Sequence, residues 1–498
     1  MDDILYGKAD IPRIINIEDC GNQVEIFQLD EEFNRISTKI DRTLWVLSNK
    51  QLKEAVTLDG NQHFKYALPC KDTGEINKWS NILRSCKADT YTVYNPVENF
   101  MIKYGYTYYH DLLPTDLPIL SFDIETTGLD NRAPDAKVLL ITNTFRKNGV
   151  ITSKTFKFDD YPSDKDMIGH WCEWVREMDP VIMCGHNIFG YDLPYLNRFN
   201  RLPLGVDGSN AKFSTRESKF RVDGSRDLHY NNVNVYGREI IDTMFLAYRY
   251  DIASKKYDSY GLKPIIKVEG LEKKDRQFYD ASKIRTNYKI KEEWEKIVAY
   301  AEEDSDDALK LFDLMAPSQF FFTRNIPRSF QSAHQSASGS QINSMLVRAY
   351  LQQKRSIPKA TEVEHFQGGI SFGNSGIYRN CLKLDIKSAY PSAILIEKLY
   401  DKEKDPEAYL YKLCHTFTHK RFEYKKLYKE TKKDYYLAMD ASSKIFINSI
   451  FGATGAPGLN FNSPKIAGKI TELVRGYLNH CSIWGTSKEL NEWISDNE

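Results

Sequence analysis

Short apolar runs alternate with amphipathic stretches through the middle of the chain. The run Ile119–Ile124 follows a linker with two prolines and predicts a buried strand. Further strands are expected at Lys137–Thr144 and Pro180–Cys184, with one helix at Asp164–Met178 and another from Leu193. This alternation favours an α/β layer around a mostly central sheet.

Helical patterns dominate the second half, whereas the first 115 residues mix short strands such as Val24–Leu29 with helical stretches such as Asn77–Lys87. No chemical cluster is recognisable in that first segment. A polar, Ser- and Gln-rich segment, Ser329–Gln341, precedes the later helices. The expected later elements are helices over 291–314 and Ile342–Lys354, a strand over Cys381–Ile386, two helices within 406–451 joined near Thr431–Asp434, and a helix over Pro464–Trp484.

Composition narrows the class of protein. A chain of 498 residues exceeds one ordinary domain, so three or four are expected. The 68 basic and 68 acidic residues balance, which argues against a simple basic coat protein but allows an enzyme with a basic channel beside acidic metal sites. The 8 cysteines form no C-x-x-C pair, so free thiols are favoured over zinc, iron–sulfur or disulfide sites.

The chain carries no signature of export or membrane insertion. Its first ten residues are acidic and polar, unlike a signal peptide. No run of about 18 apolar residues occurs. We therefore expect a soluble, cytoplasmic protein without a membrane partner, in the host cytoplasm if its source is viral.

Two carboxylates end the first buried strand. Alternation along a strand places Asp123 and Glu125 on the same side, where both can face one metal ion. Roughly nine such acid-x-acid pairs are expected by chance in a chain of this composition, so the pair alone is weak evidence. Its position at the end of a buried strand strengthens it, because catalytic residues gather there in α/β layers.

Two later motifs add to this pair. Asn187-Ile-Phe-Gly-Tyr-Asp192 follows the next apolar strand and opens a helix. Further along, Tyr300 and Asp304 are four residues apart on the predicted long helix and therefore share a face. The tyrosine can orient a water molecule while the aspartate holds a metal ion.

The ordered motifs D-x-E, N-x-x-x-(F/Y)-D and Y-x-x-x-D resemble the proofreading exonuclease of family B DNA polymerases. The resemblance implies a ribonuclease-H-like fold and a 3′→5′ exonuclease. It implies two Mg²⁺ ions per active site, with Mn²⁺ as an alternative, in-line displacement chemistry, and a DNA contact at Asn187. The implied metal ligands are Asp123, Glu125, Asp192 and Asp304, and Tyr300 would place the attacking water.

Other readings of nearby acids stay open. Asp192 could instead cap the helix that follows it. We interpret Asp306 and Asp307 as helix-surface charges. Asp242, in Ile240-Ile-Asp-Thr-Met244, matches a recurring element of these exonucleases and has either a supporting or a plain structural role.

A second set of motifs resembles the start of a polymerase site. In Phe366-Gln-Gly-Gly369, glycines allow close backbone approach, and the turn resembles the family's (Y/F)-x-G-G element, which implies template contacts at Gly368 and Gly369. Leu384–Ser392 resembles the first palm motif, with Ala389 in place of the common leucine. That resemblance implies metal binding by Asp385 and packing of Tyr390 against the nucleotide sugar.

The stretch Lys420–Lys433 carries seven basic and two acidic residues and, together with the next helix, resembles the family's fingers. Arg421 and Lys425 share one helical face, and so do Lys444 and Asn448 in a K-x-x-x-N-S-x-F-G sequence. The resemblance implies that these four side chains bind a deoxynucleoside triphosphate. Phe451 stands where this motif usually has a tyrosine, so one hydroxyl group is absent.

No D-T-D-S-like palm motif follows Gly452, and one palm carboxylate cannot hold two metal ions. We therefore expect the N-terminal part of a split or truncated family B polymerase, resembling those of tailed bacteriophages, that needs a second polypeptide to polymerise. Primer-template DNA and deoxynucleoside triphosphates are the expected partners, with a sliding clamp as a further one. The alternatives are a stand-alone exonuclease whose palm remnant grips DNA, and a non-catalytic DNA- or partner-binding subunit.

The resemblance also predicts the domain organisation of this α/β protein. The expected segments are an N-terminal domain (1–115), the exonuclease domain (116–325), a connecting segment that packs on the N-terminal domain (326–365), the first part of the palm (366–400), the fingers (401–452) and a continued, truncated palm (453–498).

Overall fold

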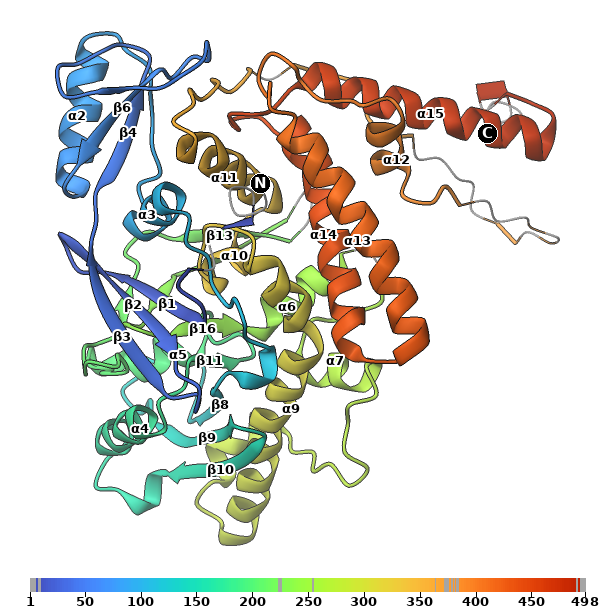
Figure 1. The fold of residues 1–498 in the computed structure, drawn as a ribbon. Helices are drawn as coiled ribbons and strands as arrows, with labels where there is room; N and C mark the ends of the chain where they lie inside the picture. Colours follow the sequence, from blue (N-terminus) through green and yellow to red (C-terminus); the bar gives the residue numbers. More distant parts are fainter. Residues whose placement is uncertain are drawn as a thin grey trace.

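The computed structural model describes residues 6–7, 10–222, 226–252, 255–362, 364–370, 376–377, 379, 381, 385–489 and 491–492. Helices and strands are mixed through the first two thirds, and helices make up the regular structure of the last third (Figure 1). The mixed α/β class expected from the sequence is confirmed.

Two antiparallel sheets build the N-terminal region. One has the order β1-β2-β3 and the other the order β5-β6-β4-β7. The strands are β1 (Ile14–Asp19), β2 (Gln23–Leu29), β3 (Arg35–Asp41), β4 (Leu44–Ser48), β5 (Val56–Thr57), β6 (Tyr66–Cys70) and β7 (Thr90–Tyr91), and the helices are α2 (Thr73–Ser85) and α3 (Pro96–Tyr104). Strand β4 is buried along its whole length and packs against both helices.

A five-stranded sheet of order β10-β9-β8-β11-β16 forms the centre of the next region. Its strands are β8 (Ile119–Thr126), β9 (Val138–Lys147), β10 (Val150–Lys157), β11 (Ile182–Gly185) and β16 (Glu239–Asp242). Strands β8, β11 and β16 run parallel, and β9 pairs antiparallel with both β8 and β10. A mixed five-stranded sheet therefore lies where the resemblance implied a ribonuclease-H-like domain.

Helices cover both faces of this sheet. Ser163 caps α4 (Asp164–Met178), whose apolar side places Trp171 against Phe122 of β8, with ring centroids 5.5 Å apart. On the other side, α9 (Lys291–Thr323) crosses β8, β9 and β11. The Thr142 hydroxyl of β9 donates to the Ala301 carbonyl of α9 over 3.0 Å, which fixes the helix over the middle of this strand.

Helix α9 continues nine residues beyond the predicted end at 314, although Pro317 lies inside it. The added turns bury Met315 and a run of three phenylalanines, Phe320–Phe322. Phe320 stacks on Tyr109 of the N-terminal region at a centroid distance of 4.4 Å. Burial of aromatic surface against neighbouring elements therefore outweighs the hydrogen bond that proline removes.

Most of the polar segment Ser329–Gln341 is helical. Ser329 caps α10 (Phe330–Gln335) by accepting from Ser332 N over 3.1 Å, and α11 (Ser338–Gln352) begins before the predicted Ile342. Gln341 is buried and donates to the Ala333 carbonyl over 2.6 Å. Hydrogen bonds to backbone groups thus let a polar sequence occupy a buried position.

The last third is built from helices. They are α12 (Ala389–Ile396), α13 (Tyr409–Thr431), α14 (Asp434–Gly455) and α15 (Pro464–Thr486). Helices α13 and α14 form a long antiparallel hairpin, and α14 packs on α9 and α11 (Figure 1). Phe417 of α13 stacks between them on Phe446, with centroids 3.9 Å apart.

Of the predicted strand Cys381–Ile386, residues 382–384 lie outside the described part of the chain, and Cys381, Asp385 and Ile386 adopt no regular structure.

All eight cysteines are free thiols. Over the described residues, no helix is both long and apolar enough to cross a bilayer. The remaining described elements are η1 (Pro114–Asp116), η2 (Phe158–Asp160), α5 (Asp192–Leu196), η3 (Asn197–Phe199), β12 (Lys212–Phe213), β13 (Ser218–Arg221), β14 (Asp227–Tyr230), β15 (Val233–Asn234), α6 (Thr243–Asp251), α7 (Leu262–Val268), η4 (Ala281–Lys283) and α8 (Ile284–Asn287).

Candidate exonuclease site

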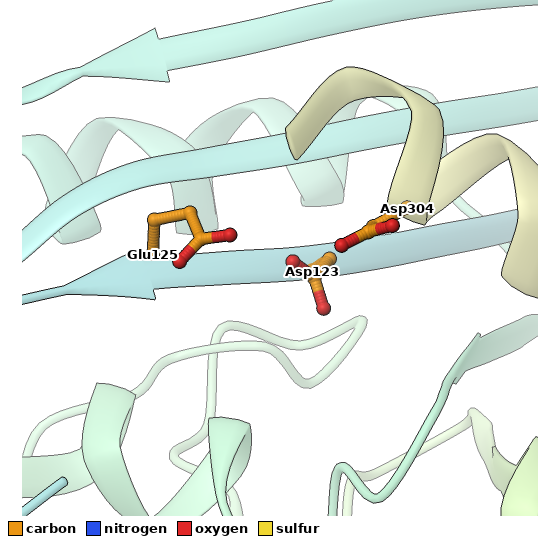
Figure 2. Close-up of side chains that lie close together, drawn as sticks. All are labelled: Asp123, Glu125 and Asp304. Carbon is orange, nitrogen blue, oxygen red and sulfur yellow. The ribbon is translucent and has the colours of Figure 1, made fainter. Parts of the chain in front are cut away.

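Three carboxylates from two elements converge over the central sheet. Asp123 and Glu125 project from the same side of β8, and the carboxylate of Asp304 points from α9 toward Asp123 (Figure 2). One carboxylate oxygen of each lies within 4.8 Å of the other two. The structure therefore brings together residues 179 to 181 positions apart in the sequence, as the three motifs required.

Asp192, the fourth predicted ligand, is the first residue of α5. Tyr191 occupies the N-cap position and makes no side-chain cap hydrogen bond, so the alternative role of Asp192 as a helix cap is not adopted. The Asp192 side chain is buried, and its Oδ1 atom has no hydrogen-bond partner among the described residues. Its negative charge contributes to raising the pKa of Asp123, which places it electrostatically in the same group.

Burial raises the pKa of every carboxyl in this group, and repulsion within the group adds to this at Asp123 and Glu125. Burial is the largest cause at each one. It acts with the neighbouring acids to raise the pKa of Glu125 to about 8, and with Asp242 to raise that of Asp192 to about 8. The pKa of Asp123 is raised well above its ordinary value. Such a cluster is costly unless cations neutralise it.

Asp242 holds the loop that delivers Asp192. Its carboxylate accepts from Asn187 N over 2.8 Å and from Phe189 N over 3.3 Å, and it caps α6 through Met244 N over 2.9 Å. Asn187 adopts a left-handed backbone conformation with φ of 64°. Asp242 therefore anchors the loop that leads to Asp192.

Two cations that the sequence did not single out lie at Asp304. Lys263 of α7 places its Nζ atom 3.2 Å from Asp304 Oδ2, and Arg276 places Nη2 2.6 Å from Asp304 Oδ1. Both cations act to lower the pKa of Asp304, against the larger effect of burial. No motif or spacing marks these two residues in the sequence; only the fold brings them to the site.

Tyr300 lies one turn before Asp304 on α9 and is almost fully buried. Its hydroxyl accepts a hydrogen bond from the ammonium group of Lys263, which also lies 3.9 Å from the centre of the Tyr300 ring. Lys263 thus joins the tyrosine and the aspartate of the third motif in one network.

The interpretation of Asp307 as a surface charge is wrong. Its side chain is 2% exposed and pairs with Arg276 and with Lys310, whose Nζ lies 3.0 Å from Asp307 Oδ1. Asp306 is more exposed and pairs with Lys273 and Lys310 on the outer side of α9. Arg276 therefore bridges Asp304 and Asp307 from inside the protein.

The donor set fits a hard divalent cation. Carboxylate oxygens are the ligands that Mg²⁺ and Mn²⁺ prefer. Asp123, Glu125 and Asp304 offer converging oxygens, and Asp192 adds an unpartnered Oδ1. Both oxygens of Asp304 already contact a cation, Lys263 or Arg276, which a bound metal ion would share or displace. Asp123, Glu125 and Asp304 could therefore hold such an ion, and Asp192 lies in the same buried group.

The predicted polymerase residues lie elsewhere, near α12. Tyr390 stacks on Phe451 with ring centroids 4.2 Å apart and planes 2° from parallel. A side chain at Gly369 would approach the Tyr390 hydroxyl to 3.1 Å, and the Gly368 carbonyl accepts from Arg475 over 2.6 Å. Asp385 is exposed, and it belongs to no group of three or more possible metal ligands among the described residues.

The four predicted triphosphate ligands lie on the two helices of the hairpin, two on α13 and two on α14. Arg421 pairs with Asp440 over 3.1 Å and donates to Ser388 Oγ over 3.2 Å. Lys444 and Asn448 are exposed on α14 and line a cavity that faces α9. Lys425 is half-buried on α13.

Comparisons with known proteins agree with the resemblance to a family B exonuclease. The family profile described as "DNA polymerase family B, exonuclease domain" matches residues 106–265. A DNA polymerase of Thermococcus sp. (strain GE8) is 24% identical over 297 residues, which cover 56% of this chain and 16% of that protein. The DNA polymerase delta catalytic subunit of Candida albicans is 24% identical over 452 residues, which cover 76% of this chain and 42% of that protein.

The chain thus spans less than half the length of these curated relatives. They are archaeal and fungal, so the expected likeness to bacteriophage polymerases stays a prediction. Among solved structures, the family B DNA polymerase of the hyperthermophilic archaeon Pyrobaculum calidifontis superposes with a TM-score of 0.74 at 16% identity, covering 95% of this chain and 71% of that one. Residues 106–265 therefore match the exonuclease domain of the family B DNA polymerases, and the chain shares the fold of a polymerase of that family.

Proposed function

We propose that this chain removes nucleotides from the 3′ ends of DNA strands by divalent-metal-dependent hydrolysis. The observation that carries the proposal is the convergence of Asp123, Glu125 and Asp304 within 4.8 Å, with the buried Asp192 beside them. Four carboxylates from three separate motifs match a site for two divalent cations, which stabilise both the attacking and the leaving oxygen of an in-line displacement when bound.

In this proposal the remaining polar residues position the reactants. The Tyr300 hydroxyl orients the attacking water, and Lys263 holds that hydroxyl through its ammonium group. Lys263 and Arg276 also fix the Asp304 carboxylate from two sides. Asn187, on the loop anchored by Asp242, contacts the DNA strand.

We further propose that the chain is part of a family B DNA polymerase organised in the six segments expected from the sequence. Asp385 would bind a metal ion, and Tyr390 would pack on the sugar of an incoming deoxynucleotide. Arg421, Lys425, Lys444 and Asn448 would bind its triphosphate. Two-metal nucleotidyl transfer needs more than one carboxylate, so we propose that another is supplied from outside these 498 residues, by a second polypeptide or by more of the same one.

Two alternative functions predict different behaviour toward DNA. A stand-alone exonuclease would digest DNA equally well whether or not polymerase partners are present. A non-catalytic DNA-binding subunit would leave DNA intact. The four carboxylates favour a catalytic role, because nothing in simple DNA binding requires buried acids facing one another.

A paired assay separates these functions. The purified chain is incubated with Mg²⁺ and a 3′-recessed primer-template, without nucleotides and with all four, beside an Asp123→Ala variant. Primer shortening that the variant lacks supports the exonuclease. Extension in the presence of nucleotides would show that another acid of this chain completes the polymerase site, and an intact primer in every lane would support the binding subunit.

A further inference from the structure

A cavity of about 910 Å³ lies between the helical hairpin and the body of the protein. Helix α14 forms one wall, and α6, the second half of α9 and the α10–α11 segment form the others. This cavity is separate from the carboxylate group, since none of the four acids lines it. Its volume falls within the range of roughly 300–1,000 Å³ typical of small-molecule sites.

The walls are mainly apolar. Leu314, Pro317 and Phe321 face the cavity from α9, and Leu437 and Ala441 face it from α14. Leu314 and Leu437 are 37% and 47% exposed, so apolar surface on both walls stays in contact with solvent. Covering this surface with an apolar ligand would be favourable in proportion to the area removed from water.

One end of the cavity is cationic. Lys444 lines it, and no acidic side chain pairs with Lys444 anywhere in the described part of the chain. Asn448, one turn later, adds an amide group on the same helical side. Arg249 also lines the cavity, but its guanidinium donates to the Ser336 carbonyl over 3.2 Å and is therefore already engaged.

Neither acid of the lining forms an ion pair with Lys444 among the described residues. Asp313 is paired with Arg146. Asp434 begins α14, ten residues before Lys444 and so roughly 15 Å away along the helix. A ligand with one anionic group would therefore place it at Lys444 and its apolar part between α9 and α14.

We propose that this cavity binds an amphipathic organic anion with a planar, apolar body and one acidic group, held by Lys444 and wedged between α9 and α14. The proposal does not rest on the nuclease function, because the cavity shares no residue with the carboxylate group. The cavity shares Lys444 and Asn448 with the proposed triphosphate site but not Arg421 or Lys425, and apolar walls make up most of its surface. A nucleotide and this ligand would therefore compete for Lys444. Such a ligand would bridge the hairpin and the ribonuclease-H-like region.

The test uses the full chain without nucleotide or DNA and the fluorescent anion 1-anilinonaphthalene-8-sulfonate as the probe. We expect saturable binding at one site. Leu437→Glu adds a repelling charge at a solvent-exposed position, and Ala441→Trp fills the cavity; both should abolish the enhancement. Lys444→Met should weaken binding roughly tenfold, while binding of the uncharged analogue N-phenyl-1-naphthylamine should stay unchanged.

Matched controls locate the site. Lys426→Met removes an exposed lysine of α13, and Trp484→Ser removes the 74% exposed tryptophan of α15; neither should alter binding. Circular dichroism melting verifies that each variant is folded, and Leu437→Glu decides the outcome if Ala441→Trp does not fold. Unchanged binding in Leu437→Glu, or loss of binding in Trp484→Ser, would overturn the proposal.

Discussion

The ammonium group of Lys263 lies 3.2 Å from Oδ2 of Asp304 and donates a hydrogen bond to the hydroxyl of Tyr300. One lysine on the short helix α7 thereby ties together both residues of the motif on α9. Since Asp304 and Tyr300 are proposed to hold a metal ion and a water molecule, the position of Lys263 should control how well both are aligned.

Replacing Lys263 tests this relationship. We expect Lys263→Met to lower the exonuclease rate roughly 10- to 100-fold, the usual cost of losing a group that orients metal ligands. Lys267→Met is the matched control, because Lys267 is exposed on the same helix and makes no described contact with the site. Single-turnover digestion of a labelled oligonucleotide gives both rates, and equal rates for Lys263→Met and wild type would contradict the role assigned to Lys263.

Asp242 should act through the loop it anchors. An asparagine at this position has one acceptor oxygen for the backbone donors of Asn187, Phe189 and Met244, so at least one buried N–H loses its partner at a cost of about 1–3 kcal/mol. We expect faster amide hydrogen exchange over residues 186–192 in Asp242→Asn, together with a higher Mg²⁺ requirement. The exposed Asp258→Asn is the control, and unchanged exchange in Asp242→Asn would exclude the anchoring role.

The buried Asp307 should matter more than its neighbour Asp306. Asp307→Asn weakens the ion pair with Arg276, and we expect a loss of about 1–3 kcal/mol in stability. Asp306→Asn alters a more exposed pair and should change stability by less than about 1 kcal/mol. Hydrogen exchange along α9 measures both, and equal effects would contradict the buried bridge.

Glu239 gives a pH dependence that is independent of the metal ligands. Burial raises its pKa from the usual 4.5 to about 8, although Asn16 Nδ2 and Gln331 N donate to it over 3.0 Å and 2.7 Å. Between these pH values the folded protein binds a proton that the unfolded chain has released, so this group destabilises the fold increasingly as pH rises from 4.5 to about 8.

Glu239→Gln keeps the shape without the titration. The glutamine oxygen can still accept from Gln331 N, and the glutamine amide can donate to Asn16 Oδ1 once the Asn16 amide group turns over. This would give a partner to Asn16 Oδ1, which is buried and unpartnered among the described residues. We expect the melting temperature of the variant to exceed that of wild type by an amount that grows from pH 5 to pH 8. A difference that is constant over this range would show that Glu239 titrates normally.

Much of the carboxylate site could be predicted because its geometry is local. Strand alternation fixes Asp123 beside Glu125, and helical periodicity fixes Tyr300 beside Asp304, so each half of the site follows from a short sequence. Helix α4 was also predicted with its observed bounds, because Ser163 caps a strongly amphipathic segment. The convergence of the separate halves, in contrast, rested on the family resemblance.

The features that sequence reasoning missed depend on tertiary contacts. Lys263 and Arg276 come from segments without a chemical motif, and the fold alone places them at Asp304. Asp307 lies on a helix that is buried on more than one side. The acidic residues around it suggested an exposed face, and the prediction of a surface position was therefore wrong. Helix α9 continues through Pro317 because phenylalanines beyond it pack on the N-terminal region, which local propensity does not reveal.

The most direct test of the central claim is the polarity and metal dependence of DNA digestion. A single-stranded oligonucleotide labelled at its 3′ end, and the same strand labelled at its 5′ end, are incubated with the chain and Mg²⁺ or Mn²⁺. We predict immediate release of the 3′ label as a mononucleotide, gradual shortening of the 5′-labelled strand, and loss of both with a chelator or with Asp123→Ala. Intact strands with the wild-type chain, or equal digestion by Asp123→Ala, would contradict the assignment of the carboxylate group as a 3′→5′ exonuclease site.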